Sequence, residues 1–266
     1  TGNAGLALLC FYGWGARHDR DGEYRDNVQK ALDYLLRIQK EDGDLSGRGK
    51  MYCHSIASIA LCEAYGISKD ERLREPAERS IAYTLAAQSK SKGGWRYNPG
   101  EDSDTSITGW QYMALHSARL AGLKVPEENF VRAREWLDTA GGGKHGGLYG
   151  YQGPGTKWPA MIATGMFCRQ LDLVAPTAPM QMESAQQLKM TPMKICEGAK
   201  RGRRGGQRVG ASGAGKTSGA AQAGPGQGPC RGPFMCGERS ASVIEAEWMA
   251  SARPHPTPPL CGPRET

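Results

Sequence analysis

GGWRYNPGEDSDTSITGW, residues 93–110, contains the main structural signals of this chain. It is a glycine-rich turn with two aromatic side chains, followed by an acidic cluster and by the start of an apolar helix. Related turns occur upstream, as EDGDLSG at residues 41–47, and downstream, as GGKHGGLYGY at residues 142–151. A phrase that recurs about every fifty residues indicates a repeat architecture.

Each turn separates two kinds of predicted helix. Helices with one polar and one apolar face are predicted at residues 24–40, 73–88 and 127–140. Helices that are apolar on most sides are predicted at residues 4–14, 51–66, 104–123 and 158–171. In the first amphipathic helix Val28, Leu32 and Leu35 share one face, as helical periodicity requires.

The alternation predicts an all-α fold made of helical hairpins in two concentric layers. The apolar helices are expected to form an inner ring because they need partners on most sides, and the amphipathic helices an outer ring. A single hairpin cannot bury its apolar face alone, so three or more units must stack to be stable. The prediction covers residues 4–171, with four inner and three outer helices.

Two of the turns carry a family resemblance. The patterns Leu35-Leu36-x-x-Gln39-x-x-x-Gly43 and Gln88-x-x-x-x-Gly93-Gly94-Trp95 resemble the Gln-Trp repeat of squalene and terpene cyclases. They are also similar to the repeat of protein prenyltransferase beta subunits. The first unit has Leu45 in place of the tryptophan, and the third has no glutamine before its turn. The resemblance implies a partial α/α toroid with a central apolar cavity, from a fragment of a longer repeat protein.

The resemblance also implies an activity, carbocation chemistry on a polyisoprenoid substrate by a terpene cyclase or a prenyltransferase-like enzyme. Glu101, Asp102 and Asp104 resemble the acid motif D-x-D-D-T-A of squalene-type cyclases, and are the candidate catalytic residues. Ser103 occupies the middle position, where the family has its proton donor, and a hydroxyl is too weak an acid for that step. The alternative is a non-catalytic toroid that binds a lipid, a peptide or a partner protein.

A structural role competes with catalysis at Asp104. This residue precedes the apolar helix and is predicted to be its N-cap, accepting hydrogen bonds from free backbone amides. Such bonds favour the ionised carboxylate, so they are expected to weaken Asp104 as a proton donor.

The candidate cavity residues are Tyr52, His54, Trp110 and Trp158, which lie near the starts of the inner helices. Trp95 and Tyr97 are expected to pack turns against helix ends instead. Zinc-binding prenyltransferases use an Asp-x-Cys pair with a distant His, and this pair is missing near Cys53 and His54. The chain also has no C-x-x-C motif, so neither a metal nor a cofactor is predicted.

Composition divides the chain near residue 171. Residues 1–171 carry a net charge of +2 and residues 172–266 a net charge of +5, the latter with 14 Gly and 11 Pro among 95 residues. This composition predicts a disordered, low-complexity basic tail, and a reading-frame error in the source sequence is the alternative. A genuine tail is expected to bind at most nucleic acid, and only weakly. Residues 210–217 match a phosphate-binding loop in letters, but the flanking sequence offers neither the strand nor the helix it needs.

No apolar run reaches the roughly 18 residues that a membrane span requires. The cyclase resemblance implies an isoprenoid or another apolar small molecule as the partner of residues 4–171, and the sequence favours no cellular compartment.

Overall fold

The computed structural model describes residues 1–154 and 158–190. This part of the chain is all-α apart from one short hairpin. The helices are α1 (Gly2–Gly13), α2 (Arg25–Ile38), α3 (Lys50–Ser68), α4 (Glu71–Ala86), α5 (Thr105–Leu120), α6 (Glu127–Ala140), α7 (Pro159–Leu171) and α8 (Pro179–Met190), with a 3-10 turn η1 at Gly47–Gly49. Strands β1 (Gly141–Gly142) and β2 (Leu148–Tyr149) pair antiparallel.

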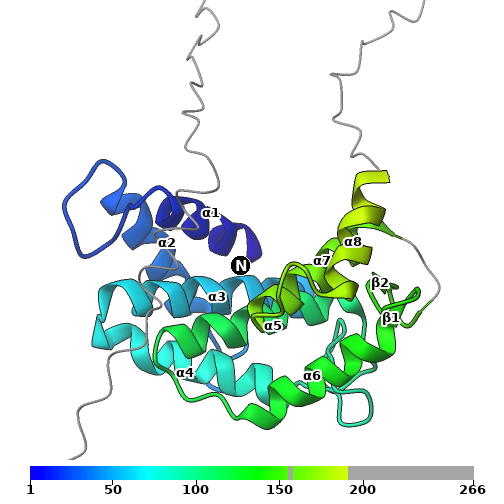
Figure 1. Ribbon diagram of the computed structural model, residues 1–266. Helices are drawn as coiled ribbons and strands as arrows, with labels where there is room; N and C mark the ends of the chain where they lie inside the picture. Colours follow the sequence, from blue (N-terminus) through cyan, green and yellow to red (C-terminus); the bar gives the residue numbers. More distant parts are fainter. Residues whose placement is uncertain (155–157, 191–266) are drawn as a thin grey trace, which may run out of the picture. The chain divides into compact units, whose positions relative to one another are not determined.

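The helices form the two predicted layers. The apolar helices α1, α3, α5 and α7 pack against one another in chain order, while α2 lies on α1, α4 on α3 and α6 on α5. Figure 1 shows α4 and α6 along one side of α3 and α5. The seven helices expected from the sequence are confirmed, and the fold is toroid-like. None of the described helices is long and apolar enough to cross a lipid bilayer.

Helix α3 is the centre of the core because it contacts α1, α4 and α5. Its small residues Ala57, Ala60 and Ala64 are fully buried and allow these neighbours to approach closely. Leu61 and Cys62 fill the same layer with larger apolar side chains. Protein interiors are close-packed, so small residues between helices set the spacing of the layers.

Glycines seat each turn on the next outer helix. Gly43 and Gly93 have φ angles of +90° and +83°, a region that favours glycine. A Cβ atom on Gly43 would lie 2.1 Å from the carbonyl oxygen of Arg79 in α4. A Cβ atom on Gly93 would lie 2.3 Å from the carbonyl oxygen of Arg132 in α6. The turns therefore touch the following helices backbone to backbone.

The two glutamines that precede these turns make a second link of the same kind. Gln39 donates from Nε2 to the carbonyl oxygen of Pro76 in α4, at 2.9 Å. Gln88 donates from Nε2 to the carbonyl oxygen of Asn129 in α6, also at 2.9 Å. Each glutamine thus links the end of one outer helix to the backbone of the next.

The third turn makes the equivalent contact by other means. Gly147 lies against α8, where a Cβ atom would be 2.2 Å from the carbonyl oxygen of Met180. The Glu183 carboxylate of α8 accepts hydrogen bonds from the backbone amides of Lys144, His145 and Gly147, at 2.7, 3.0 and 2.9 Å. A carboxylate from the next helix therefore takes the place of the missing glutamine.

These contacts extend the helical domain beyond its expected end. The sequence placed a disordered tail from residue 172, but α8 packs on α7 and β2 and occupies the position of a fourth outer helix. Its weak amphipathic pattern hid it, since it is anchored by Glu183 and Ser184 rather than by an apolar stripe. The disorder and the nucleic-acid binding expected of residues 191–266, and the phosphate-loop pattern at 210–217, lie outside the described residues.

The glycine contacts predict a large effect of one methyl group. Gly93→Ala combines a left-handed backbone with a close approach to Arg132, and should destabilise the fold by roughly 3 kcal/mol. Gly100 is the matched control because its φ is +71° and nothing lies within 4 Å of the position that a Cβ atom would take. Gly100→Ala should cost only about 1 kcal/mol. Urea denaturation measures both, and equal losses would contradict the role given to the turn.

Candidate functional site

The acidic segment, residues 101–104, directly precedes the first residue of α5. Asp104 is fully buried and is the N-cap of α5, as predicted. Its Oδ1 accepts from the backbone amide of Ile107 at 2.8 Å. Its Oδ2 accepts from the Tyr151 hydroxyl at 3.3 Å. Both carboxylate oxygens are therefore engaged within the protein.

The neighbouring polar side chains do not converge on Asp104. Ser103 is buried, and its Oγ accepts from the backbone amide of Gly94 at 3.1 Å. Asp102 is exposed and accepts from the backbone amide of Ser103 at 2.8 Å. Glu101 is exposed and accepts from the backbone and side-chain nitrogens of Asn98, at 3.1 and 2.5 Å. Each acid stabilises its own local turn.

The electrostatics of Asp104 differ from the expectation. Burial raises the pKa of its carboxyl group, and the hydrogen bonds from Ile107 and Tyr151 offset this only in part. The sequence correctly predicted the cap but predicted a carboxylate held in its ionised form. Desolvation outweighs the cap because the site excludes water from the charged form.

Four aromatic side chains lie near the start of α5. The hydroxyl groups of Tyr97 and Tyr151 are 3.0 Å apart, and the Tyr52 ring meets the Tyr97 ring edge-on with centroids 5.9 Å apart. Trp158, 53% exposed, stacks on Tyr151 with centroids 6.0 Å apart. The sequence singled out Tyr52 and Trp158 but missed the contact of Tyr151 with Asp104. Tyr97 and Tyr151 are 54 positions apart, which is about one repeat, and this spacing is the sequence signal that could have linked the two residues.

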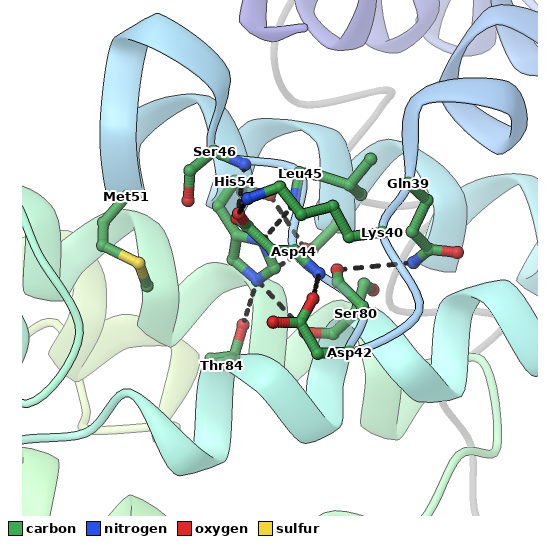
Figure 2. A network of polar contacts seen from close by, with 12 residues as sticks. Gln39, Lys40, Asp42, Asp44, Leu45, Ser46, Met51, His54, Ser80 and Thr84 are labelled. Carbon is green, nitrogen blue, oxygen red and sulfur yellow. Dashed lines mark hydrogen bonds and ion pairs between the residues drawn. The ribbon is translucent and has the colours of Figure 1, made fainter.

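His54 does not line a cavity, contrary to the expectation. It is fully buried between α3 and α4. Figure 2 shows its Nδ1 facing the backbone amide of Leu45, from which it accepts at 3.1 Å. Nε2 consequently carries the proton and donates to the Ser80 carbonyl oxygen at 3.1 Å and to Thr84 Oγ1 at 3.0 Å. His54 is a structural residue that fixes the first turn.

The hydrogen bonds of His54 continue into a buried chain. Thr84 Oγ1 donates to Gln111 Oε1 at 3.2 Å, and Gln111 Nε2 donates to the carbonyl oxygen of Met51 at 3.0 Å. Trp95 Nε1 donates to the carbonyl oxygen of Thr84 at 2.8 Å. This chain ties α3, α4 and α5 together, and the predicted packing role of Trp95 is confirmed.

A groove between α5 and α7 contains the other candidate, Trp110. The groove has a volume of about 270 Å³ and is lined by Ser106, Gly109, Trp110, Met113, Ala163, Thr164 and Phe167. Gly109 permits the close approach of α7, since a Cβ atom there would lie 2.2 Å from Thr164 Cγ2. Trp158 and Tyr52 are not among the residues that line this groove.

The described residues hold no group of three or more His, Cys, Asp or Glu side chains arranged to bind a metal ion. Cys53 and His54, the pair considered for zinc, are separated by their environments. His54 is enclosed with both ring nitrogens hydrogen-bonded, while Cys53 is partly exposed.

The environment of His54 predicts acid sensitivity. Burial lowers its pKa from about 6.5 to about 4, so between these values the unfolded chain binds a proton that the folded chain does not. Stability should therefore be full above pH 6.5 and decline as the pH falls toward 4, by about 3 kcal/mol for this residue. His54→Gln should flatten part of the decline in urea denaturation between pH 7 and pH 4. The rest of the decline should remain in this variant, because burial also lowers the pKa of His116 to about 4.

Asp104 is expected to affect stability in the opposite direction, with a loss as the pH rises. Because burial raises its pKa, its ionisation opposes folding as the pH rises through the raised value. Asp104→Asn keeps a good N-cap without the charge and should be at least as stable as the parent at pH 7. Asp104→Ala should lose about 1–2 kcal/mol of stability because the cap is gone. Thermal denaturation compares the variants, and a marked loss in Asp104→Asn would show that the charge itself is stabilising.

Comparison with known proteins agrees with the resemblance found in the sequence. Residues 28–150, a little under half of the chain, match the family model of the squalene-hopene cyclase N-terminal domain. No curated protein and no solved structure matches the chain significantly. The matched segment runs from α2 through the third turn and contains both glutamine-linked turns and the acidic segment. Residues 28–150 are therefore similar to the squalene-hopene cyclase N-terminal domain.

Proposed function

We propose that the inner helices bind an apolar chain of the polyisoprenoid class, and that residues 101–104 do not protonate it. The groove between α5 and α7 is the observation that carries this proposal. Trp110, Met113 and Phe167 present apolar surface there, and Phe167 is 42% exposed. Exposed aromatic surface in a concave site is typical of small-molecule binding.

The acid geometry argues against proton transfer from this segment. Asp104 is fully buried, and a substrate could reach its oxygens only by displacing Tyr151 or the amide of Ile107. Glu101 and Asp102 face solvent, where water competes for any proton they release. A general acid must come within about 3 Å of the atom it protonates, directly or through one water.

The size of the groove favours a limited role. Binding sites for small molecules usually enclose about 300–1,000 Å³, so 270 Å³ accommodates part of a long chain. The same size also suits the apolar side chains of a peptide, which is the second candidate. Both ligands would contact Trp110 and Phe167, and they differ in whether an isoprenoid alone is sufficient.

Isoprenoid binding can be tested with a C15 or C20 isoprenoid alcohol and the full chain. Trp110→Ala and Phe167→Ala should each weaken binding by roughly tenfold, because each removes apolar surface that the ligand covers. Val131→Ala on α6 is the control, since Val131 is 40% exposed and outside the groove. Binding is followed by NMR titration. Equal affinity in all variants, or no binding, would contradict the proposal, and binding of apolar peptides alone would favour the second candidate.

Catalysis is tested on the same protein with squalene and with a prenyl diphosphate, followed by mass spectrometry of the products. No cyclic product is expected from the parent. A cyclic product that disappears in Asp104→Asn, a variant expected to fold, would show that the acidic segment is catalytic and would overturn this part of the proposal.

A further inference from the structure

A second, polar pocket lies at the opposite end of α5 from the acidic segment. It has a volume of about 420 Å³ and forms where α5 and α7 end beside α6. Its lining consists of His116, Arg119, Arg134, Arg169, Leu171, Asp172, Leu173 and Val174. Neither the cyclase resemblance nor the groove at Trp110 accounts for it.

The charge of this lining is mainly positive. Arg119, Arg134 and Arg169 contribute three guanidinium groups against the single carboxylate of Asp172. Burial lowers the pKa of His116 to about 4, so the imidazole is neutral at pH 7 and adds no charge. Three arginines around one cavity offer the forked donors that suit the oxygens of phosphate and carboxylate groups.

Two of the three acids that pair with these arginines lie on the solvent side, and the third is Asp172 of the pocket lining, whose Oδ1 is 3.4 Å from Arg134 Nη1. Glu127 accepts from both Arg119 and Arg134 at 2.6 Å, but its side chain is 58% exposed. Asp138 pairs with Arg169 and is 66% exposed. Water and salt screen exposed partners, so these pairs neutralise the arginines only in part. Neither Glu127 nor Asp138 lines the pocket.

Two buried polar atoms in the pocket lining lack a hydrogen bond within the described residues. They are Nε2 of His116 and Oδ2 of Asp172. The other oxygen of Asp172 accepts from the Tyr112 hydroxyl at 2.6 Å, which fixes the carboxylate. Buried polar groups are nearly always hydrogen-bonded to protein, water or a ligand, so Oδ2 is an acceptor available to a ligand that brings a proton donor.

The backbone beside Asp172 is also unusual. Leu173 has a φ of +59°, whereas the equivalent position after α5 is Gly122 with a φ of +87°. A non-glycine residue in this region is strained, and such residues concentrate at binding sites. The strained turn holds Asp172 and the end of α7 at the edge of the pocket.

We propose that this pocket binds a small oxyanion that retains a proton, of the hydrogenphosphate class. Its oxygens accept from Arg119, Arg134 and Arg169, and its hydroxyl group donates to Oδ2 of Asp172. The carboxylate therefore acts as a selectivity device, since it repels a fully deprotonated anion of similar shape. The site is independent of isoprenoid binding, because the two pockets share no lining residue.

Inorganic phosphate and sulfate are the probes, titrated against the full chain at pH 7 and constant ionic strength by calorimetry. Phosphate carries a proton under these conditions and sulfate does not, so phosphate should bind at least about tenfold more tightly. Asp172→Asn removes the repulsion and should bring the two affinities close together. This change in selectivity distinguishes the pocket from arginines elsewhere in the chain, which have no reason to prefer phosphate.

The arginines are tested separately. Arg134→Gln and Arg119→Gln should each weaken phosphate binding by about tenfold, through the loss of charge-assisted hydrogen bonds. Arg74→Gln is the matched control, because Arg74 makes a comparable pair with Glu78 on α4, outside the pocket. Circular dichroism checks that the variants fold. Equal affinity for phosphate and sulfate in the parent, or unchanged phosphate affinity in Arg119→Gln, would overturn the proposal.

Discussion

Direct contact between the backbone of each turn and the backbone of the following outer helix sets the geometry of this domain. Gly43 meets α4, Gly93 meets α6 and Gly147 meets α8, each with no room for a side chain. The contact fixes how far one hairpin stands from the next. The inner helices, which no hairpin could bury alone, then pack in order, and their exposed faces form the groove at Trp110.

The units solve one structural problem with different chemistry. In the second unit, Thr108 Oγ1 of α5 accepts a hydrogen bond from the backbone amide of Trp95 at 3.0 Å. In the first unit, His54 Nδ1 of α3 accepts the equivalent hydrogen bond from the backbone amide of Leu45. A histidine therefore stands at a place in the repeat where a hydroxyl is sufficient. Both ring nitrogens of this histidine are hydrogen-bonded inside the protein, and its burial makes the core sensitive to acid.

The sequence was sufficient for the elements that depend on local patterns. Seven helices, the cap at Asp104 and the buried role of Trp95 follow from periodicity, capping chemistry and the repeat, and the family resemblance agrees with the match over residues 28–150. What it missed depends on distant contacts. Helix α8 is held by Glu183, which reaches the third turn, and the raised pKa of Asp104 depends on its burial in the folded chain. Neither has a local signature.

Because each outer helix packs on the turn that precedes it in the chain, the units of the domain depend on one another in chain order. The turn that receives α4 is complete once residues 41–47 have formed, and the turn that receives α6 once residues 89–97 have formed. During synthesis each new hairpin thus meets a surface that already exists, in the order in which the ribosome releases it. Damage to one turn would accordingly disturb the hairpins that follow it more than those that precede it.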